Sequence, residues 1–351
     1  MNQDSRISLW QVVLLLCLSR MFSVMTMCMV YTSFTIQEMF YGALLAIPLA
    51  FLVFLPGGLL FQKRPRLLLD NRLKGVWMTG YFLLAVGWLL MTLLHLDFFL
   101  GNAVFLQAPS IALLWPAVLA GCWCAYQGLE GLARYGSILF FFFALSVLLL
   151  ICTAVPQMSP ARLDPVTTVD WKNIWAAASN SLFQNPELIF LPLLAPRLAE
   201  GKLIKAGVWY CLLSGGLVAL LFGLVCFTFG DFTTNIVYPV YSLSAAMQVG
   251  FLQRLDAVYM AIWVMLALFR ISILLWFAKG FLIHAAPKRR PLSLIFFLGG
   301  LVLAVSWLLS GSLLSNQLAY NPWVMVGTVG VSALVFPMGT WLSRRKEGKA
   351  Q

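Results

Sequence analysis

Apolar stretches of about the length that crosses a bilayer recur along the whole chain. A transmembrane helix needs about 20 mostly apolar residues. Only 10% of the 351 residues are charged, against about 25% in soluble domains, and a soluble core cannot hide so much apolar surface. The sequence therefore predicts an all-α polytopic membrane protein with ten transmembrane helices, at 8–31, 39–61, 75–96, 108–126, 136–155, 174–196, 206–229, 256–283, 291–310 and 322–342.

The basic residues are distributed unevenly between the two sides that these helices define. With the N-terminus in the cytoplasm, 17 of the 23 lysines and arginines fall in cytoplasmic segments, and only Arg162, Lys172 and Arg254 fall in external ones. Cytoplasmic loops carry such an excess, so both termini are predicted to be cytoplasmic. The net charge of +11 then needs no nucleic-acid partner. Residues 1–22 lack a small-residue cleavage site, so we interpret them as a retained first helix.

The polar, proline-rich segment Pro156–Asn173 separates five predicted helices from the next five. We expect one membrane domain over 1–351, with a first repeat at 1–155, an external linker at 156–173, a second repeat at 174–342 and a cytoplasmic tail at 343–351. The first helices of the two halves cross in opposite directions, as an inverted repeat requires. The halves share no visible sequence identity, so this repeat, of the leucine-transporter-like type with broken helices 1 and 6, is inferred from topology.

The sixth apolar stretch carries Asn185, Pro186 and Glu187 in succession. A proline removes a backbone hydrogen bond, and a carboxylate in lipid is expensive and usually functional. Broken helices near mid-membrane form substrate sites in secondary transporters. Freed amides and carbonyls at such a break suit a zwitterionic amino acid. The alternative is a simple proline kink, which is how we interpret Pro48 and Pro116.

Helix 1 has a polar interruption of its own at Ser19–Ser23, with Arg20 at its centre. An arginine stays protonated in a protein, so we expect it to have a partner, and Glu187 is the hypothesis. The alternative is a structural ion pair elsewhere or a water-facing side chain. The predicted ligand-binding residues are Ser19, Arg20, Ser23, Gln184, Asn185, Pro186 and Glu187.

Other segments point away from enzymatic chemistry. All seven cysteines lie in apolar segments, so no disulfide framework is implied, and Cys122 and Cys124 are interpreted as packing residues. With only His95 and His284, a histidine-based metal site is not expected, and no cofactor or catalytic constellation is visible. The external segment Asp231–Leu255 is expected to be either a helix over the outer mouth or an interfacial segment anchored by Tyr238 and Tyr241.

Three segments resemble the spore germination permease family, which supplies the B subunit of nutrient germinant receptors within the amino acid–polyamine–organocation transporter superfamily. They read ISLWQ at Ile7–Gln11, SLFQNPELIFLPLL at Ser181–Leu194 and GFLQRLDAVYMAIWVM at Gly250–Met265. The resemblance implies an integral protein of the spore inner membrane. It also implies recognition of a small germinant, typically an amino acid, and partner A and C subunits.

Arg270, in the middle of the eighth predicted helix, bears on whether such a protein transports its ligand. In transporters with an inverted five-helix repeat, this position helps to hold a coupling sodium ion. A tethered guanidinium supplies that charge permanently and cannot couple transport to a gradient. We expect a charge network of Arg20, Glu187 and Arg270, while Lys279 is expected to snorkel towards the cytoplasmic end. The alternative for Arg270 is a pair within the bundle with no ion role.

Two functional hypotheses remain open on these observations, with a structural subunit as a distant third. The first is a receptor subunit that binds a nutrient without net transport. The second is a secondary transporter of amino acids or related solutes. Arg270 and the lack of a central lysine in the fifth helix favour the first.

Overall fold

The computed structural model describes residues 7–29, 32–64, 74–104, 109–163, 170–198, 202–246, 256–285 and 291–310. In this part of the chain almost every residue is helical, and the one β-type pairing is an isolated bridge between Ile7 and Leu198. The α-helices are α1 (Leu9–Met25), α2 (Ile36–Lys63), α3 (Lys74–Phe99), α4 (Ser110–Tyr126), α5 (Gly128–Ala154), α6 (Trp171–Phe183), α7 (Glu187–Phe190), α8 (Leu203–Phe229), α9 (Pro239–Ala246), α10 (Asp256–Ala285) and α11 (Pro291–Leu309). Short non-α turns follow several of them: η2 (Leu100–Val104), η3 (Val155–Gln157), η4 (Pro160–Arg162), η5 (Pro192–Arg197) and η6 (Gly230–Asn235).

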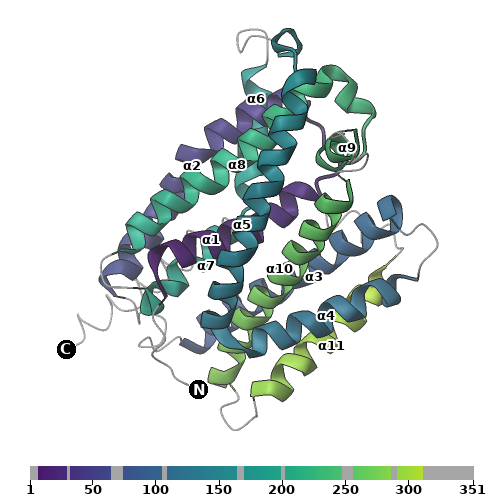
Figure 1. Cartoon of the computed structure of the whole chain (residues 1–351). Coiled ribbons are helices and arrows are strands. Elements are labelled where there is room, and N and C mark those ends of the chain that lie inside the picture. Colours follow the sequence, from purple (N-terminus) through teal and green to yellow (C-terminus); the bar gives the residue numbers. More distant parts are fainter. Residues whose placement is uncertain are drawn as a thin grey trace.

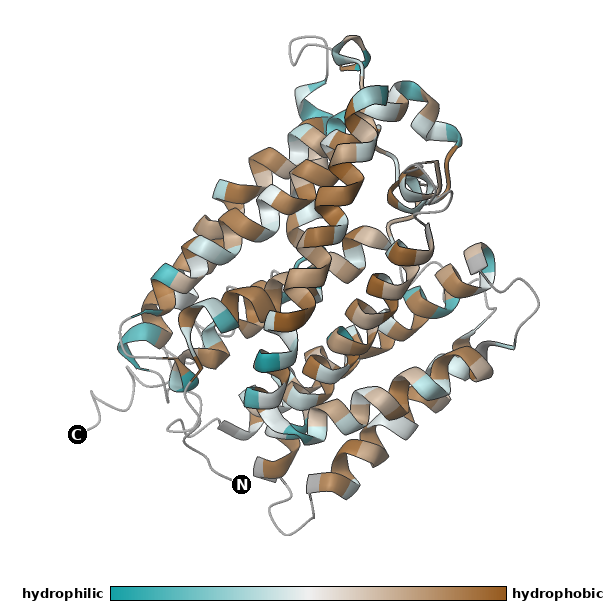
Figure 2. Cartoon of the chain, in the orientation of Figure 1, coloured by the Kyte–Doolittle hydropathy of each residue, from teal (hydrophilic) through white to brown (hydrophobic). Residues whose placement is uncertain are grey.

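Six helical stretches of the described chain are long and apolar enough to cross a membrane. They are Ile36–Lys63, Gly75–Ala103, Gly128–Gln157, Leu203–Asn235, Ala257–Ile283 and Leu292–Leu309, and Leu9–Met25 and Ile111–Tyr126 are shorter apolar helices. Figure 2 shows that hydrophobic residues cover most of the long helices. The chain is therefore a multi-pass membrane protein. The predicted helix at 322–342 lies outside the described residues.

The helices form two groups, with α1 and α5 between them (Figure 1). In one group α2 packs against α6 and α8. In the other, α10 packs against α3, α4 and α11. Helix α1 contacts α8 of the first group and α10 of the second. A residue on α1 therefore faces one group or the other according to its position around the helix.

Local sequence explains where the first two helices begin. Ser8 caps α1 in a capping box with Gln11, and Thr35 caps α2 in a capping box with Glu38. In each box the hydroxyl accepts from one free backbone N–H, and the longer side chain accepts from another. Helix α1 then runs without interruption through Ser19–Ser23 and ends at Met25.

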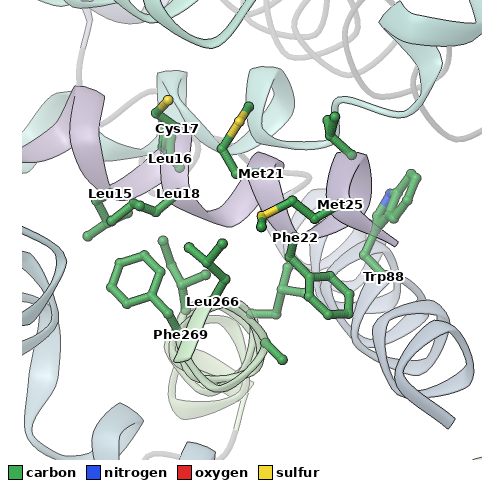
Figure 3. Packing of buried hydrophobic residues seen from close by; sticks show 14 of the residues in the cluster. Leu15, Leu16, Cys17, Leu18, Met21, Phe22, Met25, Trp88, Leu266 and Phe269 are labelled. Atoms are coloured by element: carbon green, nitrogen blue, oxygen red, sulfur yellow. The ribbon is translucent and has the colours of Figure 1, made fainter. Parts of the chain in front are cut away.

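The prediction that helix 1 is broken at Ser19–Ser23 is therefore wrong. The segment holds no proline or glycine, and the side chains of Ser19 and Arg20 find partners on other helices without any change of the backbone, as described below. Instead, the apolar side chains of α1 pack into the centre of the protein. Figure 3 shows Leu15, Leu18 and Phe22 on the side of α1 that faces Leu266 and Phe269 of α10.

The sixth predicted helix is interrupted where expected. Helix α6 ends at Phe183, α7 begins at Glu187, and the 3-10 turn η5 continues from Pro192 to Arg197. Pro186 has no N–H to donate to the turn before it. The segment thus crosses the interior as two short pieces on either side of Gln184–Pro186.

The segment after α8 contains the short helix α9, which packs against α8 and α10. Tyr238, just before it, is buried and lies edge-on to Phe99, with the ring centroids 4.8 Å apart. Tyr241 also contacts Phe99 and Tyr259. The alternative in which Tyr238 is a lipid-interface anchor is therefore wrong, because its ring belongs to the protein core.

Candidate functional site

The carboxylate of Glu187, the first residue after the break, is held by two residues from other helices. The Ser19 hydroxyl of α1 donates to Glu187 Oε1 over 2.7 Å, and Arg270 Nη1 of α10 lies 3.3 Å from the same oxygen. Glu187 and Arg270 are 2% and 1% exposed. They form a buried ion pair, and removal of either partner leaves an uncompensated charge in the interior.

Arg270 makes further contacts that fasten α10 to two other helices. Its Nη1 donates to the main-chain carbonyl of Ser19 over 2.6 Å, and its Nε donates to Thr92 Oγ1 of α3 over 3.1 Å. The guanidinium carbon also lies 5.8 Å from the ring centroid of Phe22, within cation–π range. One side chain therefore links α1, α3, α7 and α10.

Arg20 occupies a different environment, and its predicted pairing with Glu187 is wrong. Its Nη1 donates to Ser214 Oγ over 3.0 Å, and its Nη2 donates to Ser181 Oγ over 3.2 Å and to the Ser181 carbonyl over 3.4 Å. Successive residues of a helix point about 100° apart. Ser19 therefore faces α7 and α10, whereas Arg20 faces α6 and α8. Among the described residues no carboxylate lies within ion-pair distance of Arg20.

The break itself is stabilised mostly from within. The amide of Leu188 donates to the Asn185 carbonyl over 3.3 Å, and that of Ile189 donates to the Pro186 carbonyl over 2.9 Å. The Asn185 side-chain oxygen accepts a short hydrogen bond from the Tyr210 hydroxyl of α8. The backbone groups that the sequence suggested for a zwitterionic ligand are thus largely used by the turn.

Two buried side-chain atoms at the break have no hydrogen-bond partner in the described structure: Asn185 Nδ2 and Glu187 Oε2. Buried polar atoms are nearly always satisfied in folded proteins, so such exceptions call for an explanation. Each costs about 1–3 kcal/mol. The break therefore carries polar groups that its own fold does not satisfy.

A pocket lies beside the end of α6, between α1, α2, α6 and α8. It is a narrow, partly open pocket, whose space amounts to about 360 Å³ only when the open solvent at its mouth is included. Three of the seven predicted ligand-binding residues line it, and the structure places the other four outside its wall. The lining residues are Arg20, Ser23, Val24, Met39, Ala177, Asn180, Ser181, Gln184, Val218 and Phe222.

The structure thus divides the predicted ligand-binding residues into two sets. Arg20, Ser23 and Gln184 face the pocket. Ser19 and Glu187 belong to the cluster with Arg270, and Asn185 and Pro186 form the turn that joins the two.

Sequence reasoning missed the hydroxyl groups that complete both sets. Thr92 holds Arg270, Ser181 and Ser214 hold Arg20, and Tyr210 holds Asn185. Serine and threonine inside apolar helices commonly bond to a carbonyl of their own helix, as Thr92 also does with Trp88. Their presence in a span therefore gives no sign of a long-range partner.

Lys279 is a further correction. It is 3% exposed, and its Nζ donates to the Ala125 carbonyl near the end of α4 over 3.2 Å. The prediction that Lys279 snorkels is wrong, because the carbonyl at a helix terminus gives its ammonium a partner inside the protein. No group of three potential metal ligands occurs in the ranges that the structure describes.

Comparison with known protein families identifies the family of this chain, which the geometry alone does not. A sequence model described as "spore germination protein" matches residues 72–312, more than half of the chain. The chain belongs to this spore germination protein family. No curated protein matches it. The match spans Glu187 and Arg270 and confirms the resemblance found in the sequence, while α1 and α2 lie before it.

Proposed function

We propose that this chain is the membrane subunit of a spore nutrient germinant receptor. In this role it binds a small germinant, an amino acid or a related solute, beside the break between α6 and α7, and binding triggers germination. It works with A and C subunits in the spore inner membrane, surrounded by lipid. The full chain has ten transmembrane helices in a five-plus-five inverted repeat, with both termini in the cytoplasm. Membership of the spore germination family supports this role.

The observation that carries the proposal is the pocket at the end of α6. It is lined by Arg20 and Ser23 of α1 and by Gln184 at the break, so a bound solute touches both elements directly. Binding sites in membrane bundles characteristically lie at such discontinuous helices. The other four predicted binding residues lie behind the wall of the pocket and support it. They are Ser19, Asn185, Pro186 and Glu187.

Through the neighbouring ion pair, ligand binding in the pocket can change the contacts between other helices. Ser19 contacts Glu187 and Arg270, and Arg20, the next residue, faces the pocket. A ligand that prefers one position of α1 therefore biases the contacts between the two helix groups. Only a difference in affinity between two arrangements drives such a change.

Arg270 favours sensing over ion-coupled transport. Its guanidinium already donates to the Ser19 carbonyl and pairs with Glu187. A covalently tethered cation cannot bind on one side of the membrane and leave on the other. The alternative, a permease for amino acids or related solutes, is favoured by the pocket between helices of a multi-pass protein. The two functions differ in whether ligand crosses the membrane.

Thermal unfolding of the purified protein with a panel of amino acids and related small solutes tests the proposal. A ligand at about 100 times its Kd stabilises the folded state by about 2.7 kcal/mol, so the unfolding temperature should rise for at least one solute. Gln184→Ala should weaken that effect. The control Arg134→Gln removes an exposed arginine of α5 that pairs with Glu130 and should not weaken it.

Spores and proteoliposomes separate the two functions. Spores whose only copy carries Gln184→Ala should lose the response to the stabilising solute. Reconstituted protein should not accumulate that solute against a gradient. Gradient-driven accumulation would reject the sensing function in favour of the permease. If no solute stabilises the protein and the variant spores germinate normally, both the sensing function and the permease function are rejected.

A further inference from the structure

We propose that the pocket between α1, α2, α6 and α8 recognises a small monocarboxylate through Arg20 and needs no amino group on the ligand. This inference rests on the proposed function for the location of the ligand and narrows its chemistry. The class includes short carboxylic and hydroxy acids. An amino acid binds there through its carboxylate alone.

The first step concerns the charge of Arg20. This side chain is 4% exposed and lines the pocket, and an arginine remains protonated in proteins. Its hydrogen bonds in the described structure go to Ser181 and Ser214 through Nη1 and Nη2, and none involves Nε. All of these acceptors are neutral oxygens. Buried charges are normally paired, and Arg270, which is also buried, is paired with Glu187.

The second step concerns what else surrounds the pocket. The four helices around it carry a single acidic residue, Glu38 of α2. Both oxygens of Glu38 are already used: Oε2 accepts from the Thr35 amide over 2.8 Å and Oε1 from Asn173 Nδ2 over 2.7 Å. The polar lining other than Arg20 is neutral. The pocket therefore presents one positive charge and no negative charge to a ligand.

The third step is the geometry that a carboxylate finds there. A guanidinium presents several N–H donors in one plane and matches the two oxygens of a carboxylate. Ser23, Asn180 and Gln184 add hydroxyl and amide groups for the second polar atom of a hydroxy acid. The rest of the wall is apolar and includes Met39 and Phe222. These side chains suit a short carbon chain.

An amino group on the ligand finds no favourable partner in this pocket. In an α-amino acid the ammonium is attached next to the carboxylate, so it lies close to the guanidinium that holds the carboxylate. Two like charges at that range repel each other, and the pocket offers no carboxylate to offset this. We therefore expect propionate and lactate to bind at least as tightly as alanine. Alaninamide, which keeps the amine and lacks the carboxylate, should not bind.

The test compares these four solutes by thermal unfolding of the purified full chain in a buffer of low ionic strength that contains neither chloride nor other small organic anions. Propionate and L-lactate should raise the unfolding temperature, L-alanine should act no more strongly than they do, and L-alaninamide should have no effect. Arg20→Gln should weaken propionate binding at least tenfold, whereas Arg20→Lys should keep part of it. The matched control is Arg134→Gln, with unchanged affinity.

A second measurement keeps the inference testable if Arg20→Gln does not fold. Ser23→Cys places a thiol in the lining, and propionate should slow its reaction with a maleimide while alaninamide should not. Stabilisation by alaninamide, or an equal shift with chloride, would overturn the assignment of a carboxylate site. So would unchanged affinity in a folded Arg20→Gln variant. If another solute stabilises the protein while these results fail, only this inference falls, whereas failure of every solute counts against the proposed function.

Discussion

Two arginines are buried in the part of the chain that the structure describes, and their surroundings differ in one respect. Arg270 lies against a carboxylate, a main-chain carbonyl and a threonine hydroxyl. Arg20 has hydroxyl and carbonyl partners only. The first arrangement is internally neutral and suits a structural role. The second leaves a positive charge facing a pocket and suits the binding of an anion.

At this scale the pairing of Glu187 with Arg270 is directly testable. Glu187→Gln and Arg270→Gln should each lower the free energy of unfolding by about 3–5 kcal/mol, because each leaves a buried charge unpaired. The double variant should lose less than the sum, with a coupling of about 0.5–3 kcal/mol. Denaturant unfolding in detergent measures all three variants.

The matched control is the cycle of Arg20→Gln with Glu187→Gln, for which we expect a much smaller coupling. The assignment of partners would be wrong if this second cycle showed the larger coupling and the first were additive.

The sequence predicted the members of this site better than their pairing. Pro186 and Glu187 stand out in an apolar stretch because proline and carboxylate are costly there. Which arginine reaches Glu187 depends on the rotation of α1 about its axis. That rotation is determined by packing against α8 and α10, and no single residue of α1 encodes it. The hydroxyl partners were missed for a related reason, since their bonds span distant parts of the chain.

At the scale of elements, the position of α6 depends on a close approach to α2. A Cβ at Gly42 of α2 would lie 2.8 Å from Ala177 Cβ and 2.8 Å from the Ala178 amide nitrogen of α6. Small residues permit such contact between membrane helices. Because Ala177 also lines the pocket, this contact helps to determine the width of the pocket.

Gly42→Ala should therefore be destabilising. Overpacking costs about 1–3 kcal/mol, which exceeds the gain of about 1 kcal/mol in helix propensity from replacing glycine. Displacement of α6 should also weaken solute binding, and thermal unfolding with and without the solute measures both effects. Gly87→Ala in α3 is the control, because a Cβ there meets nothing within 4 Å, and it should be neutral or slightly stabilising. Equal effects of the two substitutions would contradict a tight contact between α2 and α6.

At the scale of the whole molecule, the sequence predicted the class of fold well and the continuity of helix 1 poorly. The apolar stretches coincide closely with the described helices, because length and hydrophobicity decide what crosses a bilayer. The supposed break in helix 1 rested on the topology of an inverted repeat and on the polar residues of the helix. Polar side chains do not interrupt a helix when neighbouring helices satisfy them, as Ser181 and Ser214 do for Arg20. The inverted repeat and the orientation remain predictions.

The orientation is open to a labelling test in intact cells. Because basic residues concentrate on the predicted cytoplasmic side, a cysteine at Ser159 should react with a membrane-impermeant maleimide from outside. A cysteine at Lys63 should react only after permeabilisation. The unsubstituted protein is the control, since five of its seven cysteines are buried, and Cys124 and Cys152 lie in the apolar helices α4 and α5. Labelling in the opposite pattern would reverse the predicted topology and would place the N-terminus outside.

The contacts of Arg270 have a consequence for how the protein is made. Ser19, Thr92 and Glu187 all precede Arg270 in the chain, so all three are synthesised and inserted before it. During that interval the carboxylate of Glu187 lacks its counter-charge. An unpaired carboxylate is costly in lipid, so the cluster around Glu187 is complete only once α10 has entered the membrane. The link that Arg270 makes between α1, α3 and α7 therefore forms only after those three helices have been synthesised.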